Sequence, residues 1–386
     1  MSLKHNRGAL VRFAAIAAVA ALALAGCTST ASGAGGSSSS GPIAKEDLVL
    51  VASVINTTNP YFIANIEGAK ALSKKLDIPL EIIDSQGSSQ TEISKIQAIL
   101  AQGKKVVMFV NTVASSDTPT IVDAVKRAGG YVSIWWNKPD NFEPWDSGDN
   151  FVAFQKHPGV DSGRCNAQAI GDALGGKGNV IMFPGVQDST TSQTRVAGFE
   201  AEMRENYPGI KILENQPSNW DPQLANQNAK DLIAKYGDQI NGVWSADDGM
   251  QLGAIQAFDD AGLLDKVKFA SDGLYPDTVA LMEKGYGNNA IVGETFHRGY
   301  MASAIGLYTA YLAATGEIVP SELPKEKRTS FFDIKCVTPE TLGDYLKYDT
   351  PTAAADFVDQ LVEKGPWDTE PATLIGGGGP EVLPKP

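Results

Sequence analysis

The chain reads Leu48-Val-Leu-Val-Ala-Ser-Val-Ile-Asn-Thr-Thr-Asn-Pro-Tyr-Phe62 near the start of its patterned part, and this stretch decides the fold. The apolar run from Leu48 to Val54 is typical of a strand buried on both faces of a parallel sheet. A helix is predicted from Pro60, because Asn59 suits an N-cap and proline suits the first helical position. Tyr61 and Phe62 then lie at the carboxyl end of the strand, where open α/β sheets bind ligands. An ordinary capped helix with core aromatics would read the same way.

The N-terminus indicates export. Basic residues precede an apolar run, Phe13 to Ala25, which is shorter than the roughly 20 residues that span a bilayer. The segment Leu24-Ala-Gly-Cys27 resembles the lipobox of bacterial lipoproteins, which implies cleavage after residue 26 and a diacylated Cys27. A plain secretory signal or a short anchor is the alternative. Residues 27–45 are largely Ser/Gly-rich and predict a flexible tether. We therefore expect an extracytoplasmic protein, lipid-anchored to the outer face of the membrane.

Size, charge and cysteines narrow the class further. The remaining chain exceeds the roughly 250–300 residues that one core supports, so two domains are expected. A formal charge of −13 without a basic cluster argues against a nucleic-acid partner. Cys165 and Cys336 are the cysteines outside the lipobox. Outside the cytoplasm such a pair suggests a disulfide, with two free buried thiols as the alternative.

Apolar runs alternate with helical patterns along the chain, which predicts repeated βα units and parallel sheets with right-handed crossovers. The first set has strands at 48–54, 80–83, 106–110 and 131–135, with helices at about 60–76, 89–101 and 118–128. A polar stretch, 137–150, leads into a crossing near Pro158. The second set has strands at 179–183, 210–216, 242–245, 267–270 and 289–293, followed by a long helix at 297–314 and an edge strand at 329–334.

This pattern predicts two doubly wound α/β domains joined by a three-crossing hinge, with a ligand cleft between them. The expected N-terminal domain comprises residues 46–153 and 295–335, and the C-terminal domain comprises residues 154–294 and 336–350. Residues 351–386 are expected to form an irregular tail over the surface.

Catalysis has little support in the sequence. The only histidines are His5, His157 and His297, and no G-x-S-x-G elbow or metal-ligand spacing occurs. The adjacent carboxylates Asp247 and Asp248 are neighbours in sequence, so they do not converge on one bond; a ligand contact and a helix N-cap are their simplest roles. We expect no enzyme activity, no cofactor and no metal.

Polar and aromatic residues recur where predicted strands end. They are Tyr61, Phe62, Trp136 and Asn137 in the first half, and Gln187 to Gln193, Trp220, Asp247, Asp272 and Glu294 in the second. Flat aromatic faces combined with carboxylate and amide groups suit a polyhydroxylated ligand, which stacks its C–H face and donates its hydroxyls. Any single tryptophan could equally be a core residue.

These residues carry a resemblance to a known family. From about Leu48 to Lys335 the chain is similar to the sugar-binding proteins of ABC importers, in the ribose-binding class of type I periplasmic binding proteins. The segments that carry it are Asn59-Pro-Tyr-Phe62, Thr194-Arg-Val-Ala-Gly-Phe199, Val243-Trp-Ser-Ala-Asp-Asp-Gly-Met-Gln-Leu-Gly253 and Phe269-Ala-Ser-Asp-Gly273. Lactose-repressor-like regulators share this core but begin with a DNA-binding helix pair, where this chain has a lipobox.

The resemblance implies roles for single residues. Asn59 falls on a hydroxyl contact, Phe62 and Trp220 fall on ring-stacking aromatics, and Tyr61 falls on another aromatic of the first loop. Asp247 and Asp272 match hydroxyl-binding positions, Glu294 lies near a hinge position, and Arg195 matches an arginine of the class. Two positions depart from the ribose pattern, because Trp136-Asn137 replaces an Asp-Arg pair and Gln193 replaces an arginine.

We therefore expect a monomeric, lipid-anchored solute-binding protein that delivers a small carbohydrate or polyol to an ABC permease. A sensor lipoprotein for a receptor and an anchored sugar-acting enzyme are the alternatives. We also expect a neutral or cationic ligand. The cleft should hold three carboxylates, Asp247, Asp272 and Glu294, and it lacks the two arginines that the ribose class has at the positions of Asn137 and Gln193. A Cys165–Cys336 disulfide is expected near the hinge.

Overall fold

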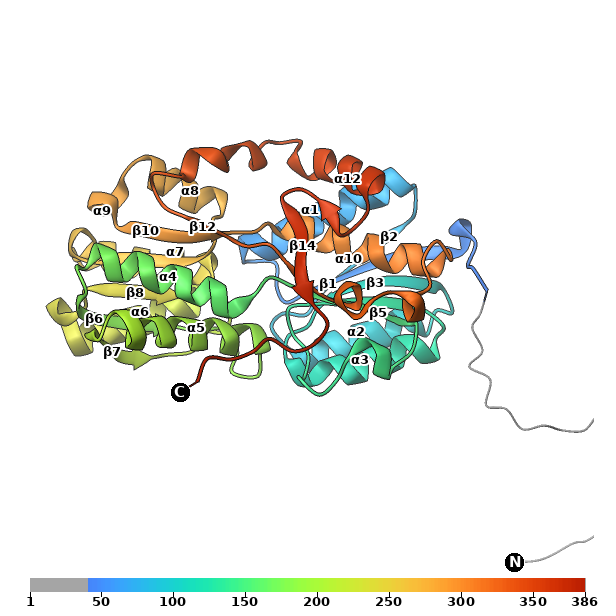
Figure 1. The fold of residues 1–386 in the computed structure, drawn as a ribbon, viewed down its shortest axis with the longest axis horizontal. Helices are drawn as coiled ribbons and strands as arrows, with labels where there is room; N and C mark the ends of the chain where they lie inside the picture. The colour runs from blue at the N-terminus through green and yellow to red at the C-terminus, as the bar shows by residue number, and fades with distance from the viewer. Residues whose placement is uncertain (1–40, 386) are drawn as a thin grey trace, which may run out of the picture. The chain divides into compact units, whose positions relative to one another are not determined.

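The computed structural model describes residues 41–385, whose strands form two sheets (Figure 1). The first sheet has the order β13 (Asp368–Thr369), β14 (Ala372–Gly377), β11 (Thr329–Phe332), β5 (Phe151–Lys156), β4 (Tyr131–Trp135), β3 (Lys105–Asn111), β1 (Leu48–Val54), β2 (Leu80–Asp84). The second has the order β12 (Lys335–Val337), β10 (Ile291–Phe296), β9 (Lys268–Gly273), β8 (Gly242–Ser245), β6 (Lys177–Phe183), β7 (Gly209–Asn215). Among the described strands, the antiparallel pairs are β10 with β12, β11 with β14 and β13 with β14, and the other neighbours pair parallel. The predicted pair of parallel-sheet domains is confirmed, and we call them the first and second lobes.

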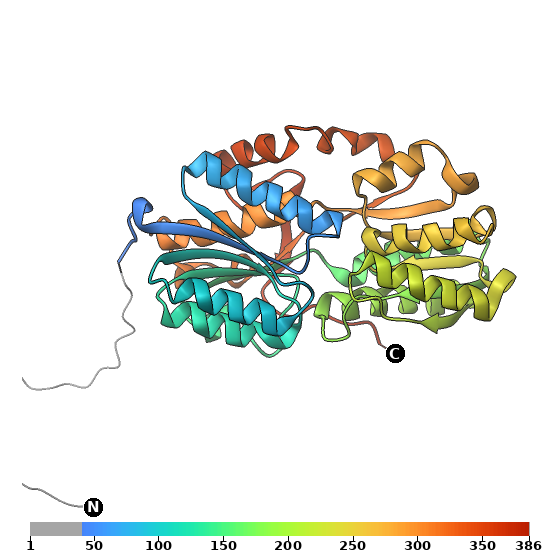
Figure 2. The same cartoon turned by 180° about the vertical axis from the view of Figure 1, so that it is seen from behind.

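Helices cover both faces of each sheet (Figures 1 and 2). The first lobe carries α1 (Pro60–Leu76), α2 (Ser89–Leu100), α3 (Thr118–Arg127), α10 (Gly299–Ala314), α11 (Lys325–Arg328) and α12 (Ala353–Lys364). The second lobe carries α4 (Gly159–Ala173), α5 (Thr190–Asn206), α6 (Pro222–Tyr236), α7 (Asp248–Asp260), α8 (Pro276–Glu283) and α9 (Tyr286–Asn289). Across residues 41–385, none of these helices has the length and apolar character needed to cross a bilayer.

Strand β1 is buried on both faces, as its sequence predicts. Leu50 belongs to the core that includes residues of α1 and α10, whereas Val49 and Val51 belong to the core beneath α2 and α3. Successive side chains of a strand point to opposite faces, so a run without polar interruption requires a helix layer on each side. This packing makes β1 an interior strand, between β3 and the edge strand β2, and its carboxyl end faces the second lobe.

The chain passes between the lobes at three places that the sequence predicted approximately, and a fourth time between β12 and α12, where it returns to the first lobe. It leaves the first sheet after β5 through His157 and Pro158, and it leaves the second sheet after β10 through His297 and Arg298. It returns to the second sheet between β11 and β12. Strand β10 extends to Phe296 and α10 begins only at Gly299, because β10 pairs with β12, a partner that local sequence does not reveal.

The C-terminal part is largely regular, which corrects the prediction of an irregular tail over residues 351–386. Helix α12 buries Phe357, Val358 and Leu361 and contacts α1 and α10, and β14 extends the first sheet beyond β11. The glycine run at the end of β14 suggested irregular chain. One of these glycines, Gly377, instead allows a close strand contact, because a Cβ there would lie 1.8 Å from the carbonyl oxygen of Thr329.

The C-terminal residues also add connections between the lobes beyond the three predicted. The carboxylate of Glu381 accepts hydrogen bonds from the backbone N–H of Gly159 (3.0 Å) and Val160 (2.6 Å), at the start of α4. The same carboxylate pairs with the ammonium of Lys156 at 2.6 Å, at the end of β5. A residue of the tail therefore supplies the cap that Pro158, at the N-cap of α4, does not provide.

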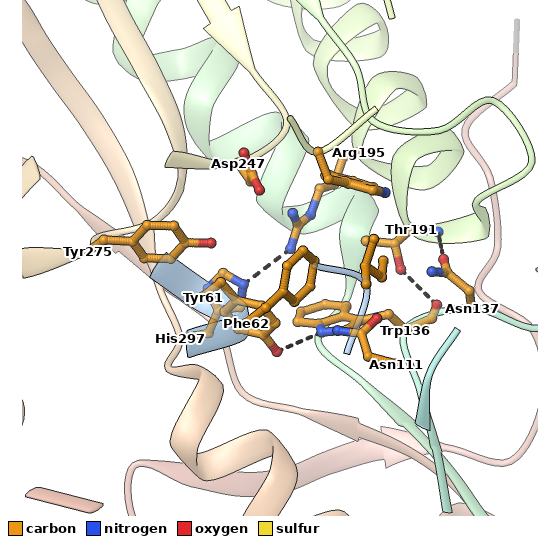
Figure 3. Close-up of a pocket in the computed structure, with 12 residues that line it drawn as sticks. Tyr61, Phe62, Asn111, Trp136, Asn137, Thr191, Arg195, Asp247, Tyr275 and His297 are labelled. Carbon is orange, nitrogen blue, oxygen red and sulfur yellow. Dashed lines mark hydrogen bonds between the residues drawn. The ribbon is translucent and has the colours of Figure 1, made fainter. Parts of the chain in front are cut away.

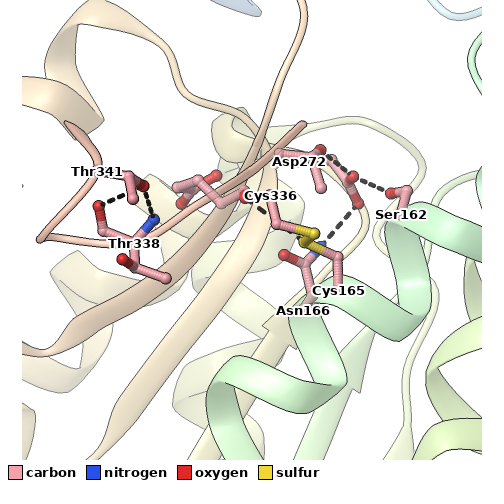
Figure 4. Close-up of a disulfide and its surroundings, with 9 residues drawn as sticks. Ser162, Cys165, Asn166, Asp272, Cys336, Thr338 and Thr341 are labelled. Atoms are coloured by element: carbon pink, nitrogen blue, oxygen red, sulfur yellow. Dashed lines mark hydrogen bonds between the residues drawn. A yellow bond between two sulfur atoms is a disulfide. The ribbon is translucent and has the colours of Figure 1, made fainter. Parts of the chain in front are cut away.

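Cys165 and Cys336 are joined as a disulfide, with their Cα atoms 5.8 Å apart (Figure 4). Cys165 lies on α4 and Cys336 on β12, so both belong to the second lobe. The bond lies beside the third crossing but does not link the two lobes. It fastens the edge strand β12 to α4, the helix that covers the sheet.

Helices α4 and α5 approach each other closely enough to require glycine. A Cβ on Gly163 would lie 2.0 Å from the carbonyl oxygen of Arg195, and a Cβ on Gly198 would lie 2.1 Å from that of Val160. We expect Gly163→Ala and Gly198→Ala each to lower the free energy of unfolding by about 1–3 kcal/mol, because overpacking outweighs the better helix propensity of alanine. Urea unfolding measures this.

The matched control is Gly343→Ala, since a Cβ at Gly343 would have no atom within 4 Å. This variant should unfold at the wild-type urea concentration. A midpoint for Gly163→Ala equal to that of the control would contradict the close contact between α4 and α5.

Candidate functional site

A pocket lies where the carboxyl ends of the strands of both lobes meet (Figure 3). It encloses about 330 Å³, counted with its open mouth. Its lining residues are Ile55, Tyr61, Phe62, Asn111, Trp136 and Asn137 from the first lobe, Thr191, Arg195, Trp220, Asp247 and Tyr275 from the second, and His297 from the second crossing. Ligands of open α/β sheets bind at this edge, so the pocket is the candidate functional site.

The start of α1 places two aromatic side chains in the pocket. The side chain of Asn59 accepts a hydrogen bond from the backbone N–H of Tyr61 at 2.9 Å, and Pro60 occupies the first helical position, as predicted. The rings of Tyr61 and Phe62 pack edge to face, with their centres 5.6 Å apart. The indole N–H of Trp136 donates to the hydroxyl of Tyr61 at 2.7 Å, so three aromatic side chains form one fixed wall.

The loops that carry the pocket aromatics hold unusual backbone conformations. Trp136 has a φ of 72° and Trp220 a φ of 61°, and Leu274, directly before Tyr275, has a φ of 52°. A left-handed conformation costs a non-glycine residue about 1–2 kcal/mol. Strain of this kind persists where the surrounding structure imposes it, and it concentrates at functional sites. The loops of both lobes therefore aim aromatic side chains into the pocket at a cost in stability.

Arg195 lies at the centre of the site with its side chain 4% exposed. Its guanidinium donates to the carbonyl oxygen of Ala246 at 2.5 Å and to Nε2 of His297 at 3.4 Å. It also lies 4.9 Å from the centre of the Trp136 ring, in a cation–π contact. The carboxylate of Asp272, 3.7 Å from Nε of Arg195, compensates the charge.

Asp247 lines the pocket and also connects the lobes. One of its oxygens caps α7 by accepting from the backbone N–H of Met250 at 2.8 Å, and the other accepts from Nδ2 of Asn59 at 2.6 Å. Burial raises the pKa of Asp247 to about 6, although both hydrogen bonds oppose this rise. Asn59 belongs to the first lobe and Asp247 to the second, so this hydrogen bond holds the cleft in the observed arrangement.

Two further contacts join the lobes beside the pocket. The hydroxyl of Ser189 donates to Oδ1 of Asn137 at 2.7 Å, and that of Thr191 donates to the carbonyl oxygen of Trp136 at 2.7 Å. Seven of the residues predicted for the site line the pocket: Tyr61, Phe62, Trp136, Asn137, Arg195, Trp220 and Asp247. Asn59 was also predicted to bind the ligand; it does not line the pocket but donates a hydrogen bond to Asp247, which does.

Besides Asn59, three predicted site residues do not line the pocket: Asp272, Glu294 and Gln193. Asp272 is held inside the second lobe by Asn166 at 3.1 Å and by the hydroxyls of Ser162 and Thr295 (Figure 4). Glu294 accepts from Nε2 of Gln251 at 2.6 Å, and its burial raises its pKa well above the usual range. These two carboxylates lie within β9 and β10, because both strands run further than their apolar residues suggest.

Gln193 is exposed on α5 and donates to the carbonyl oxygen of Gln187 at 2.8 Å. It borders a separate hollow beside the C-terminal tail. The predicted group of three cleft carboxylates is therefore reduced to Asp247.

The sequence prediction missed four lining residues, Ile55, Asn111, Tyr275 and His297, and it included Thr191 only within the range Gln187 to Gln193. Asn111 is the last residue of β3, so the rule that placed Trp136 after β4 could have found it. His297 could not be found in this way, because its position depends on where the chain crosses between the lobes. Within residues 41–385, no three His, Cys, Asp or Glu side chains gather as metal ligands.

Four buried polar atoms on the pocket residues have no hydrogen-bond partner in the described structure. They are Nδ2 of Asn111, Nε of Arg195, Nε1 of Trp220 and Nδ1 of His297. An unpartnered buried polar group costs about 1–3 kcal/mol, so such atoms are rare unless a ligand or water completes them.

Known proteins with related sequences and structures support this assignment of the fold. Residues 50–317 match a family described as periplasmic binding protein domain. The xylitol-binding protein of Mycolicibacterium smegmatis is 25% identical over 83% of this chain and 85% of its own length. The ribose import binding protein RbsB of Escherichia coli is 25% identical over 74% of this chain and 90% of its own length.

A solved structure, described as a twin-arginine translocation pathway signal protein from Burkholderia phytofirmans, has a TM-score of 0.77 at 29% identity, covering 87% of this chain and 99% of that one. The family match spans well over half of the 386 residues. The chain therefore belongs to the periplasmic binding protein family.

Proposed function

We propose that this protein captures a small neutral carbohydrate or polyol between its lobes and delivers it to an ABC permease. The observation that carries the proposal is the make-up of the pocket, in which aromatic rings from both lobes surround polar groups whose charges are balanced. Aromatic faces stack on the C–H face of a sugar, and buried polar groups fix its hydroxyls. The curated relatives with xylitol and ribose in their names agree with this ligand class.

The charges in the pocket favour a neutral ligand, for a different reason from the three cleft carboxylates that the sequence predicted. Arg195 is the one lining residue with a guanidinium or ammonium group, and Asp272 beneath it already compensates its charge. Asp247 contributes the facing carboxylate. An anionic ligand would lie close to the carboxylate of Asp247, and the pocket would have no further cation to balance the charge of the ligand. Placing like charges together in this way costs several kcal/mol. Binding without catalysis is the role that these groups support.

Tryptophan fluorescence tests the proposed ligand class. Trp136 and Trp220 line the pocket from opposite lobes, so a bound ligand should change the intrinsic emission. Titration with neutral pentoses, hexoses and alditols should give saturable changes, and the matching uronic and aldonic acids should bind at least about tenfold more weakly. Tighter binding of an acid than of its neutral counterpart, or no response to any neutral compound, would count against the proposal.

Lipid anchoring is the second part of the proposed function. The predicted signal segment, the tether and Cys27 lie outside the described residues, so this part rests on the resemblance of Leu24–Cys27 to a lipobox. We expect wild-type protein to fractionate with membranes and to carry acyl chains. Replacement of Cys27 by alanine should abolish both, as mass spectrometry of the N-terminal peptide can show. Acylation that persists in Cys27→Ala would refute the anchor.

A further inference from the structure

Asp248 and Glu294 form a pair of buried carboxyl groups that do not line the pocket. Both residues are fully buried, and their carboxyl groups lie in contact where α7 begins beside β10. Nε2 of Gln251 donates to Oε1 of Glu294 at 2.6 Å and lies 3.5 Å from Oδ1 of Asp248. One amide group is therefore divided between the two carboxyl groups.

The groups around this pair do not supply a balancing positive charge. Within residues 41–385, neither carboxyl group takes part in an ion pair, and the cations of the neighbouring segments pair with other carboxylates: Arg195 with Asp272, Arg298 with Asp349 and Lys335 with Asp333. Asp247 and Asp272 add negative charge nearby, whereas α4 and α8 contribute the uncharged Cys165 and Thr278. The phenol of Tyr275 is neutral, because burial raises its pKa.

Two buried carboxyl groups in contact without a cation retain one proton, because two adjacent negative charges repel strongly at low dielectric. The geometry assigns this proton to Glu294. Oδ2 of Asp248 accepts from the backbone N–H of Tyr275 at 2.5 Å, whereas Oε2 of Glu294 has no partner in the described structure. A proton on Oε2 allows Glu294 to donate to Asp248. Burial and the adjacent Asp248 raise the pKa of Glu294 well above its usual range, in agreement with this assignment.

The hydrogen bond from Tyr275 to Asp248 connects this pair to the pocket. The ring of Tyr275 lines the pocket and stacks on Tyr61 of the first lobe, with the ring centres 6.2 Å apart. Leu274, directly before it, has a φ of 52°, so the surrounding structure must hold this loop in a strained conformation. Asp248 provides such a contact at the backbone of the next residue.

We propose that Glu294 is protonated and donates a hydrogen bond to Asp248, and that this pair positions Tyr275 at the pocket. The inference goes beyond the proposed function and rests on it only for the effect on ligand binding. Loss of the proton would leave two adjacent buried anions. Their repulsion would displace the carboxylate of Asp248 and release the backbone N–H of Tyr275.

Urea unfolding of the full exported chain at several pH values from about 6 to 7.5 tests the proton. The folded protein holds a proton that the unfolded chain releases above the ordinary pKa of glutamate, so its stability falls as the pH rises toward the folded-state pKa. Glu294→Gln keeps a donor to Asp248 but has no proton to lose. The unfolding equilibrium constant of the wild type should therefore rise about tenfold per pH unit relative to that of Glu294→Gln. Equal pH dependence in the two proteins overturns the inference.

Infrared spectroscopy of the wild type tests the proton without a variant. Burial raises the pKa of Asp247 to about 6 and that of Glu92 to about 7, so both groups are largely ionised at a pH of about 8.5. The carbonyl band of a protonated carboxyl group should remain at this pH and should be missing from Glu294→Gln. Absence of the band from the wild type overturns the inference, even if Glu294→Gln does not fold.

Hydrogen exchange of single backbone amides tests the positioning of Tyr275. Glu294→Leu removes the donor to Asp248, so the N–H of Tyr275 should exchange at least about tenfold faster than in the wild type. Glu294→Gln should retain the wild-type rate. The N–H of Met250, bonded to Asp247 at 2.8 Å, is the internal control. Unchanged exchange of Tyr275 in Glu294→Leu, or an equal acceleration at both amides, overturns the positioning role.

Calorimetric titration with ribose and with xylitol measures the effect on binding. Glu294→Leu should bind the tighter of these two probes about tenfold more weakly than Glu294→Gln, because Tyr275 is no longer held at the pocket. Equal affinity in the two variants overturns the role of the pair at the pocket. Failure of the wild type to bind either probe counts against the proposed function alone, since unfolding and hydrogen exchange decide the inference without a ligand.

Discussion

Replacing Arg195 with leucine is expected to weaken ligand binding by more than 100-fold and to destabilise the second lobe. The substitution removes a donor from the pocket and the cation that lies on the ring of Trp136. It also leaves the buried carboxylate of Asp272 without a compensating charge, and breaking a buried pair in this way costs about 3–5 kcal/mol. Fluorescence titration measures the affinity and urea unfolding measures the stability.

The matched control is Gln193→Ala, two residues earlier on the same helix. Gln193 is exposed and does not line the pocket, so affinity and stability should both remain at wild-type values. Arg195→Lys should be intermediate, because lysine keeps the charge but loses the planar set of donors. Wild-type affinity in Arg195→Leu, or a loss in Gln193→Ala as large as in Arg195→Leu, would contradict the assignment of the pocket.

Reduction of the disulfide between Cys165 and Cys336 should lower the free energy of unfolding by about 3–5 kcal/mol. The two cysteines are separated by 171 residues in sequence, so the bond closes a long loop and strongly restricts the unfolded chain. Urea unfolding with and without reductant gives the difference. Neither cysteine lines the pocket, so the affinity of the folded protein for its ligand should be unchanged.

The double variant Cys165→Ser/Cys336→Ser serves as the control, because reductant should not shift its unfolding midpoint. Alkylation followed by peptide mapping identifies the state of each cysteine separately from Cys27. Labelling of both Cys165 and Cys336 in the unreduced, folded protein would contradict the disulfide.

The sequence predicted those features that depend on local pattern. The run Leu48 to Val54 identifies a strand buried on both faces, and the pair Asn59-Pro60 identifies the helix start that places Tyr61 and Phe62 in the pocket. Both are set by burial periodicity and capping chemistry within a few residues. The pocket tryptophans follow from the same logic, since each lies in a loop beyond the end of a strand.

The features that were missed depend on contacts between distant residues. Asp272 and Glu294 were placed in the cleft because their strands were expected to end three residues earlier than they do. Glu294 pairs with Val337 of the antiparallel strand β12. The residues around Glu294 in the sequence do not indicate this distant partner. His297 reaches the pocket only because the second crossing passes beneath the pocket. There it lies next to Arg195, which belongs to α5.

The structure of the protein with its tightest-binding neutral sugar tests the central claim most directly. We predict the ligand in the pocket between the lobes, with a ring face against Trp136 or Trp220 and oxygens within hydrogen-bond distance of Nδ2 of Asn111 and the guanidinium of Arg195. A ligand bound outside this pocket, or one that leaves these donors unpaired, would contradict the account.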